Sequence, residues 1–256
     1  MTVVRGGLAR AVAVLGIGLL ATACTVVTGG KAQAPPSLEP RSLTGQAIRQ
    51  VLLGDETLSR ILQQPFIIDR RVPPRYGGPE ALQDLGSSLP VDCLGVAEML
   101  HQSVYGASKV NDVAVETWRH AARPAQLTGI KEGVVSLATA ADANALFSRF
   151  AQQWQSCDGH TVLLRDDVFR LKAEITNVQV APSVLAGTVS IAFDSPGQDS
   201  ASIPAGRAIG VRGNCLVEVE VDYFNASSRS LQGSSITNAT AFDIARLMMD
   251  RVSALS

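Results

Sequence analysis

Two short stretches of the chain carry side chains that could hold a ligand. Arg75 and Tyr76 lie in a segment rich in proline, glycine and arginine, residues 66–90. Trp118 and His120 are two positions apart, so in a β-strand they share one face. Guanidinium groups pair with anions, and a large aromatic side chain on a polar face normally has something to cover it. These four residues are therefore the candidate ligand-binding residues.

Each stretch also has a purely structural explanation. Long irregular segments are either functional or mobile surface, and for residues 66–90 a solvated surface loop is the simpler interpretation. A helix or loop packed over Trp118 would cover its ring without any ligand. The pattern slightly favours this cover over a groove wall.

No arrangement of residues identifies an enzyme. The chain lacks a Gly-x-Ser-x-Gly elbow, a His-Glu-x-x-His helix, a phosphate-binding glycine loop and a Cys-x-x-Cys pair. Its three histidines, His101, His120 and His160, fall in different predicted elements, which leaves few bases for a serine triad. We therefore expect a binding domain that is not an enzyme and needs no cofactor. The alternatives are an envelope-modifying hydrolase that uses one of these histidines, and a lipid carrier.

Three carboxylates alternate with apolar residues in the last predicted strand. Glu218, Glu220 and Asp222 share one face of the stretch 215–224, and valines occupy the other face. This is the pattern of an antiparallel strand with one solvated side. A row of carboxylates could bind a cation, but like charges on a solvated face are common, so no metal site is predicted.

The remaining cysteines are more typical of a disulfide than of a metal site. Cys93, Cys157 and Cys215 lack the spacing of zinc ligands, and in an oxidising compartment two of the three should pair. Cys93 begins one predicted amphipathic helix and Cys157 ends another. A bond between those ends requires antiparallel helices or helix ends that converge from different directions.

The N-terminal residues predict an oxidising compartment. Arg5 and Arg10 accompany an uncharged apolar run, residues 11–21, which is too short to span a bilayer of about 30 Å. Such a segment is typical of a secretory signal peptide. Residues 1–23 are therefore predicted to be removed from the mature protein.

The residues around Cys24 resemble a bacterial lipobox. The sequence Ala-Thr-Ala-Cys ends at Cys24, although the usual leucine is displaced by one position, to Leu20. The resemblance implies cleavage before Cys24 and attachment of diacylglycerol to its sulfur, followed by fatty acids such as palmitate. Two or more acyl chains hold a protein stably on a bilayer. Ordinary secretion after Ala23, with Cys24 as a plain thiol, is the alternative.

Composition and spacing divide the rest of the chain into a tether and one folded region. Residues 24–42 are rich in glycine and proline and predict a flexible tether, whereas 43–256 can form a domain with a sizeable core. The formal net charge of -1 argues against a nucleic-acid partner. We expect a monomer.

Hydrophobic periodicity predicts helices at both ends of this domain and strands between them. Helices are expected where apolar residues recur at helical spacing, and strands where they alternate. The predicted helices are 46–53, 55–62, 93–106, 139–157 and one containing 241–252, and the predicted strands are 110–120, 134–138, 161–164, 169–180, 184–193, 205–212 and 215–224. The expected fold is α+β, a central antiparallel sheet of about five or six strands with helices packed against it.

This arrangement resembles the extracytoplasmic sensor domain of the mycobacterial receptor kinase PknH, which also occurs in free-standing lipoproteins. The likeness covers residues 43–256. It rests on the order of elements, on the Asp92-Cys93 helix start, and on Trp154 and Cys157 before a glycine turn. The resemblance implies a sensor-like domain with a deep cleft for an unidentified ligand.

The family also implies a disulfide between Cys93 and Cys157. A second bridge of the family has no counterpart here, because residues 161–180 contain no cysteine. Cys215 is therefore expected to be a buried free thiol. A bridge between Cys157 and Cys215 is the competing assignment.

Together these expectations place the protein on the extracytoplasmic face of the cell membrane. The membrane lipid would be contacted through Cys24. The domain would bind an unidentified small molecule or a component of the cell envelope.

Overall fold

The protein is described here from a computed structural model. The structure describes residues 41–83, 87–122, 127–165, 170–194, 201–224 and 235–256. By its contacts the chain separates into two units, Met1–Leu38 and Glu39–Ser256, and every described residue belongs to the second. The predicted signal peptide, Cys24 and nearly all of the predicted tether lie outside the described residues.

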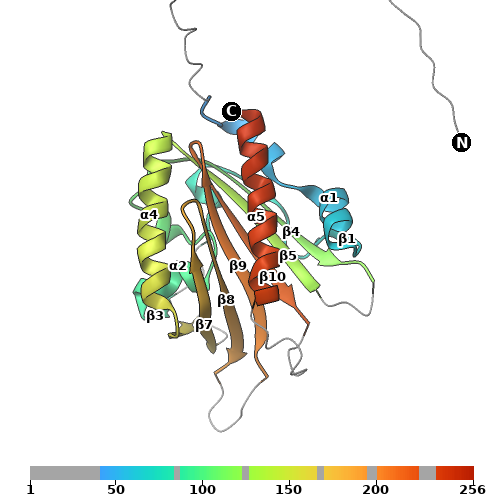
Figure 1. Ribbon diagram of the computed structural model, residues 1–256, viewed down its shortest axis with the longest axis vertical. Helices are drawn as coiled ribbons and strands as arrows, with labels where there is room; N and C mark the ends of the chain where they lie inside the picture. The colour runs from blue at the N-terminus through green and yellow to red at the C-terminus, as the bar shows by residue number, and fades with distance from the viewer. Residues whose placement is uncertain (1–40, 84–86, 123–126, 166–169, 195–200, 225–234) are drawn as a thin grey trace, which may run out of the picture. The chain divides into compact units, whose positions relative to one another are not determined.

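Ten strands of the described residues form a single antiparallel sheet (Figure 1). Their order across the sheet is β1-β4-β5-β10-β9-β8-β7-β6-β3, and β2 also pairs with β4. The strands are β1 (Phe66–Ile68), β2 (Arg75–Gly77), β3 (Ser87–Leu89), β4 (Val110–His120), β5 (Leu127–Leu137), β6 (Thr161–Arg165), β7 (Arg170–Val180), β8 (Val184–Phe193), β9 (Ile203–Arg212) and β10 (Cys215–Tyr223).

The α+β class and the antiparallel sheet are as predicted, but the sheet has more strands than the expected five or six. Strands β1, β2 and β3, which were not among the seven predicted strand segments, come from the segment 66–90, which was predicted to be irregular. These three-residue strands attach to β4 and β6 through main-chain hydrogen bonds, so their pairing depends on neighbours that the local sequence does not reveal. A two-residue turn at Gly213-Asn214 joins β9 to β10 as a hairpin, and Gly213 adopts the positive φ of +54° that this turn requires.

Five α-helices and three short 3-10 helices occur in the described residues. The α-helices are α1 (Gly54–Leu62), α2 (Leu94–Ala97), α3 (Gln102–Tyr105), α4 (Ala140–Cys157) and α5 (Ser235–Leu255). The 3-10 helices are η1 (Gly45–Val51), η2 (Pro79–Ala81) and η3 (Val91–Cys93).

Helix α5 packs on one face of the sheet, over β8, β9 and β10 (Figure 1). Its apolar stripe is buried as predicted, with Ile244, Met248 and Val252 at most 1% exposed. Gly210 on β9 lies directly beneath Met249, so the missing side chain lets the helix approach closely. Segments η1 and α1 complete the core on this face.

Helix α4 packs on the opposite face. Thr139 caps it, because the Thr139 hydroxyl accepts a hydrogen bond from the Asp142 amide at 3.1 Å. Phe147, Phe150 and Trp154 form an aromatic stripe on its buried face, and Trp154 is 0% exposed. Helices α2 and α3 lie on this same face and share its core.

The predicted continuous helix 93–106 is wrong. The chain forms η3 and α2, leaves the helical path at Glu98–His101, and resumes as α3. Leu100 has a φ of +58°, and its carbonyl accepts a hydrogen bond from the Gln83 amide at 2.8 Å. This contact with the distant Gln83 takes the backbone at Leu100 out of the helix, although the apolar residues of 93–106 are spaced along the sequence as in a single helix.

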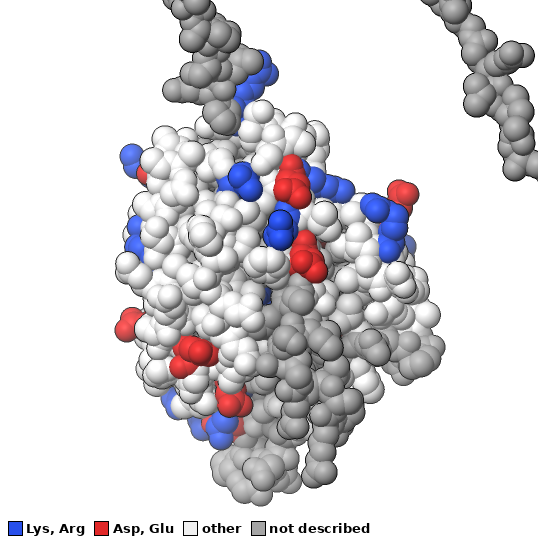
Figure 2. Space-filling model, viewed as in Figure 1, with Lys and Arg blue, Asp and Glu red and all other residues white. Residues whose placement is uncertain are grey.

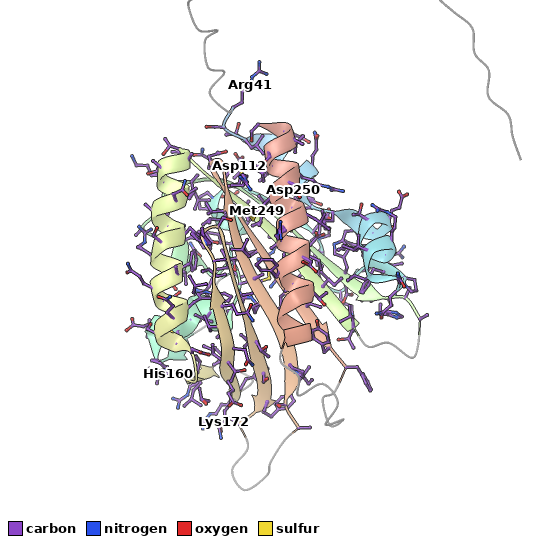
Figure 3. All side chains as sticks on the ribbon, in the orientation of Figure 1. Arg41, Asp112, His160, Lys172, Met249 and Asp250 are labelled. Atoms are coloured by element: carbon purple, nitrogen blue, oxygen red, sulfur yellow. A yellow bond between two sulfur atoms is a disulfide. The ribbon has the colours of Figure 1, made fainter. Side chains whose placement is uncertain are left out.

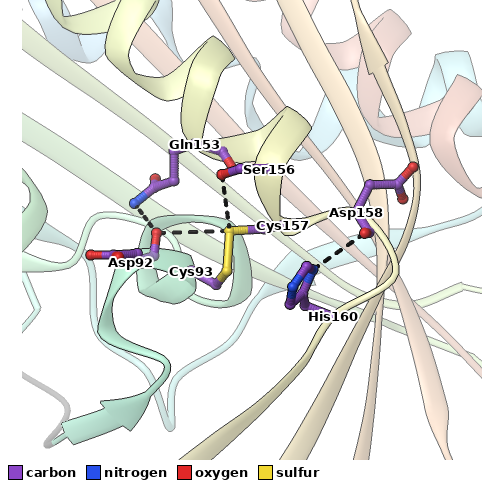
Figure 4. The surroundings of a disulfide bond; sticks show 7 residues. All are labelled: Asp92, Cys93, Gln153, Ser156, Cys157, Asp158 and His160. Atoms are coloured by element: carbon purple, nitrogen blue, oxygen red, sulfur yellow. Dashed lines mark hydrogen bonds between the residues drawn. A yellow bond between two sulfur atoms is a disulfide. The ribbon is translucent and has the colours of Figure 1, made fainter.

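The disulfide joins Cys93 to Cys157, as the family resemblance implied (Figure 4). The two α-carbons are 5.7 Å apart. The Gln153 side chain donates a hydrogen bond to the carbonyl of Asp92 beside the bridge. Cys215 is a buried free thiol, so the competing assignment, a bridge between Cys157 and Cys215, is wrong. Burial raises the pKa of the Cys215 thiol to about 12.

The first described residues are held at one end of the sheet. Asn214 receives a hydrogen bond from the Leu43 amide at 2.8 Å and donates one to the Leu43 carbonyl at 2.9 Å. Arg251 of α5 donates to the carbonyls of Leu52 and Leu53. Arg41 lies at the same end of the domain (Figure 3).

Charged side chains are scattered over the α5-bearing face. In its described part, Figure 2 shows Lys and Arg next to Asp and Glu, with broad uncharged areas between them. This mixture agrees with a formal net charge near zero.

Candidate functional site

A cavity of about 1280 Å³ opens at the end of the sheet where β1, β4 and β5 meet the residue after β10. It lies at the start of β5 and the end of β4, away from the end that holds Leu43. Its lining residues are Ile67, Ile68, Asp69, Arg70, Arg71, Arg119, His120, Ala121, Ala122, Thr128 and Phe224.

Three guanidinium groups face this cavity, and one carboxylate accompanies them. The Asp69 carboxylate accepts two hydrogen bonds from the Arg71 side chain, at 2.9 and 2.7 Å. The Arg71 hydrogen bond holds the pKa of Asp69 at about 2, against the opposing effect of burial. Within the described part of the chain, neither Arg70 nor Arg119 pairs with a carboxylate, so the lining keeps a positive excess.

The cavity also has exposed apolar walls. Phe224 is 66% exposed and Ile67 is 39% exposed, although both are large hydrophobic residues. The cavity surface therefore combines a cationic excess with apolar groups. Such a surface fits a ligand that has an anionic part and an apolar part.

Of the four candidate ligand-binding residues, only His120 lines the cavity. Its ring packs edge-on against Phe66, with centroids 5.7 Å apart. Trp118 shares the face of His120 as predicted, but it is buried at 7% exposure and its indole donates to Glu132 at 3.0 Å. Other residues of the domain core thus cover Trp118, which agrees with the explanation that needs no ligand.

Arg75 and Tyr76 point to opposite sides of β2. The Tyr76 hydroxyl donates to Glu116, and the Arg49 guanidinium lies 4.0 Å from the centre of its ring. Burial, followed by the Glu116 carboxylate, raises the pKa of Tyr76 to about 12. Arg75 is half-buried on the other side, where burial lowers its pKa. Neither residue lines the cavity.

The sequence interpretation missed Arg119, Thr128 and Phe224 as cavity residues. Arg119 lies between the two aromatic candidates and therefore belongs to the other face of β4 by alternation. It reaches the cavity because β4 ends there, so its side chain lies at the rim. The run Arg70-Arg71 was visible as a basic loop, but no local signal placed it beside the end of β4.

The three carboxylates of β10 are not on a solvated face, which corrects the prediction. Glu218 is 1% exposed and pairs with Arg207 of β9 at 2.9 Å. Tyr105 donates to the same carboxyl group, and burial raises the pKa of Glu218. Helices α2 and α3 cover this part of the sheet, because Arg207 also donates to the Val96 carbonyl at 3.1 Å.

The row of carboxylates formed by Glu218, Glu220 and Asp222 runs along β10 toward the cavity. Burial, reinforced by Glu220, raises the pKa of Asp222 to about 7. Burial also lowers the pKa of Lys131, whose α-carbon is paired with that of Glu220. The Thr128 hydroxyl donates to the Asp222 carbonyl at 3.3 Å, so the row ends at the cavity wall. Among the described residues, no group of three or more His, Cys, Asp and Glu side chains is arranged to hold a metal ion.

Residues 43–251 match the family of PknH-like extracellular domains. The chain belongs to this family. None of the helices in the described residues is long and apolar enough to cross a membrane.

One solved structure agrees with the PknH-like fold. The crystal structure of the extracellular domain of PknH from Mycobacterium tuberculosis is 18% identical and covers 84% of this chain and 100% of that chain, with a TM-score of 0.65. At this identity the likeness establishes the fold alone. A putative uncharacterized protein from Mycobacterium smegmatis is 11% identical and covers 81% of this chain and 96% of that chain, with a TM-score of 0.39. No curated protein sequence matches the chain.

The three histidines of this PknH-like domain occupy separate environments. His120 lines the cavity, and the His160 ring lies 3.4 Å from the Asp158 carbonyl beside the disulfide (Figure 4). His160 lies at a different end of the domain from Asp112 and Arg41 (Figure 3).

His101 lies between a serine and a carboxylate. The Ser103 hydroxyl is 2.9 Å from His101 Nδ1, and a Glu98 carboxyl oxygen is 3.9 Å from Nε2. His101 is buried at 3% exposure. The Ser103 amide also donates to Nδ1, at 3.3 Å, which is the geometry of a side chain capping the short helix α3. The group does not line the cavity.

Proposed function

We propose that the protein is an extracytoplasmic, lipid-anchored binding domain that is not an enzyme. It holds a small molecule or a component of the cell envelope in the cavity at the end of β1, β4 and β5. Membership in a family of extracellular domains supports the location. The preformed cavity, with its positive excess and apolar walls, is the observation that carries the proposal.

The anchor at Cys24 is the second part of the proposal. Its support is the lipobox-like sequence and the apolar run before it. Mass spectrometry of protein from its native host should find diacylglycerol on Cys24. Cys24→Ser should move the protein from the membrane fraction to the soluble extracytoplasmic fraction. An unmodified Cys24 thiol in the native protein would contradict the anchor.

Ligand binding is tested by thermal stabilisation of the domain with envelope lipids and cell-wall fragments. A true ligand should raise the Tm of the parent protein. Ala121→Trp should abolish that shift, because Ala121 is an exposed residue of the cavity wall and the larger ring would occupy the space. Ala254→Trp is the matched control, since Ala254 is exposed at the far end of α5.

The binding proposal fails if no fraction of the envelope shifts the Tm. It also fails if Ala121→Trp and the parent respond alike to every fraction.

The group of Glu98, His101 and Ser103 supports a second candidate, a hydrolase. Its order of carboxylate, imidazole and hydroxyl is that of a catalytic triad. The close sequence spacing and the capping hydrogen bond favour a structural role. A fluorophosphonate probe should therefore leave Ser103 unlabelled. Labelling that disappears in Ser103→Ala and in His101→Ala would establish the hydrolase instead.

A further inference from the structure

The cavity lining suggests which class of envelope component it takes. The basic groups are concentrated on the β1–β2 connection and at the end of β4, through Arg70, Arg71 and Arg119. Asp69 is hydrogen bonded to Arg71 and also interacts electrostatically with Arg119, so a single carboxylate accompanies three guanidinium groups in this lining. A guanidinium group matches the geometry of phosphate oxygens better than that of a neutral glycan.

The apolar residues are at the mouth of the cavity rather than in the domain core. Phe224 exposes 66% of its surface and Ile67 exposes 39%. Large exposed hydrophobic side chains that adjoin a basic site are typical of protein surfaces that meet a membrane interface. A soluble phosphate compound would leave these side chains without a partner.

Chain length permits the cavity to reach the bilayer that would carry the anchor. Leu43 lies at the end of the sheet where β5 finishes, and β5 has 11 residues, so the cavity is roughly 35 Å away along the strand. Cys24 and Leu43 are 19 positions apart in the sequence. That length reaches at most about 65 Å when fully extended. The extended length of the segment from Cys24 to Leu43 therefore exceeds the distance along β5 from Leu43 to the cavity.

We infer that the cavity binds the phosphate-bearing headgroup of an anionic lipid within a membrane surface. Arg70, Arg71 and Arg119 contact the phosphate, and Phe224 and Ile67 lie against the acyl-chain boundary. This inference rests on the proposed binding function and names its ligand class. The lipid stays in the bilayer, because the cavity is open and charged rather than a closed apolar chamber.

Residues 39–256 are suitable for a direct test without the anchor. They form one compact unit that contains both buried cores. Their fold is shared with an extracellular domain that was crystallised as a separate chain. Omitting Cys24 also removes binding through its own acyl chains.

The experiment measures co-sedimentation of this domain with phosphatidylglycerol vesicles and with phosphatidylcholine vesicles. Binding should require the anionic lipid and should weaken with added salt. Each cation removed from an anionic surface is expected to weaken binding about fivefold. Arg70→Glu combined with Arg119→Glu should therefore weaken binding by roughly 25-fold or more.

Two further variants separate the site from general electrostatic attraction. Arg212→Glu makes the same change of charge at the end of β9, beside the first residue of β10 and away from the cavity, and should have little effect. Phe224→Ser should reduce vesicle binding while leaving the Tm of the free domain nearly unchanged, because Phe224 is mostly exposed.

Inorganic phosphate and a water-soluble short-chain phosphatidic acid distinguish the sources of the phosphate. The lipid inference is overturned if inorganic phosphate alone saturates the site and Phe224→Ser binds vesicles as the parent does. Equal binding to neutral vesicles, or an equal loss in Arg212→Glu, also overturns it. If vesicles fail but cell-wall fragments raise the Tm of the parent and not of Ala121→Trp, the binding function stands and only the lipid class is wrong.

Discussion

Glu132 offers a pH-dependent test of the packing between the N-terminal segment and the sheet. Its carboxylate is 0% exposed and accepts hydrogen bonds from the Leu53 amide at 3.1 Å and from the Trp118 indole at 3.0 Å. Glu116 lies directly opposite it on β4. Burial is the main cause that raises the pKa of Glu132 from 4.5 to about 7, and the two donors only partly oppose it.

The sign of the effect follows from this shift. Between pH 4.5 and about 7 the folded protein binds the proton of Glu132 more tightly than the unfolded chain does. The free energy of unfolding therefore falls as the pH rises through this window, and it levels off above the folded pKa. A shift of this size corresponds to about 3 kcal/mol between the two ends of the window.

Glu132→Gln removes this titration but keeps a carbonyl acceptor in the same place. Its amide group cannot accept from both donors, so at pH 4.5 the variant should be less stable than the parent by about 1–3 kcal/mol. At pH 8 the parent has lost the stabilisation that comes from the raised pKa of Glu132, so the stability of the variant relative to the parent should rise by about 3 kcal/mol. Asp222, whose pKa is also raised to about 7, titrates in both proteins and cancels from the difference.

The measurement is urea unfolding between pH 4.5 and 8.5, followed by fluorescence of the buried tryptophans Trp118 and Trp154. Glu56→Gln, which removes an exposed carboxylate from α1, is the control for the loss of a charge. A difference between Glu132→Gln and the parent that stays constant across this pH range would refute the argument.

Other substitutions test the remaining contacts. Cys157→Ser opens a disulfide that joins residues 64 positions apart, and it should lower the free energy of unfolding by roughly 4 kcal/mol; reductant should destabilise the parent equally and the variant not at all. Arg207→Met leaves the buried Glu218 without its cation and should cost about 3–5 kcal/mol in urea unfolding, whereas adding Glu218→Leu should recover part of the loss. Arg251→Met removes the donors that hold η1 and α1, so hydrogen exchange there should speed up while β9 and β10 keep their protection.

The outer elements of the fold could be predicted because their signals are local. Helix α4 has an apolar stripe at helical spacing and a capping Thr139, and both features act within one or two turns. The hairpin at Gly213-Asn214 likewise depends on a single turn. Neither requires knowledge of a distant partner.

The break in the predicted helix 93–106 and the burial of the β10 carboxylates could not be predicted in the same way. Gln83 draws the backbone at Leu100 out of the helix, from a segment that the sequence showed only as an irregular loop. Arg207 neutralises Glu218 from the neighbouring strand. In each case the deciding contact joins segments that are remote in sequence or lie on different strands.

The candidate site shows the same division. The sequence by itself determined which residues carry charge, which strands alternate, and which cysteines were available to pair. Only the tertiary structure decided that Arg70 and Arg71 lie beside Arg119 and Phe224, because β1 pairs with β4 while β10 ends next to β5. Strand order is set by main-chain pairing and by the burial of both faces of the sheet, and neither is encoded in a local pattern of side chains.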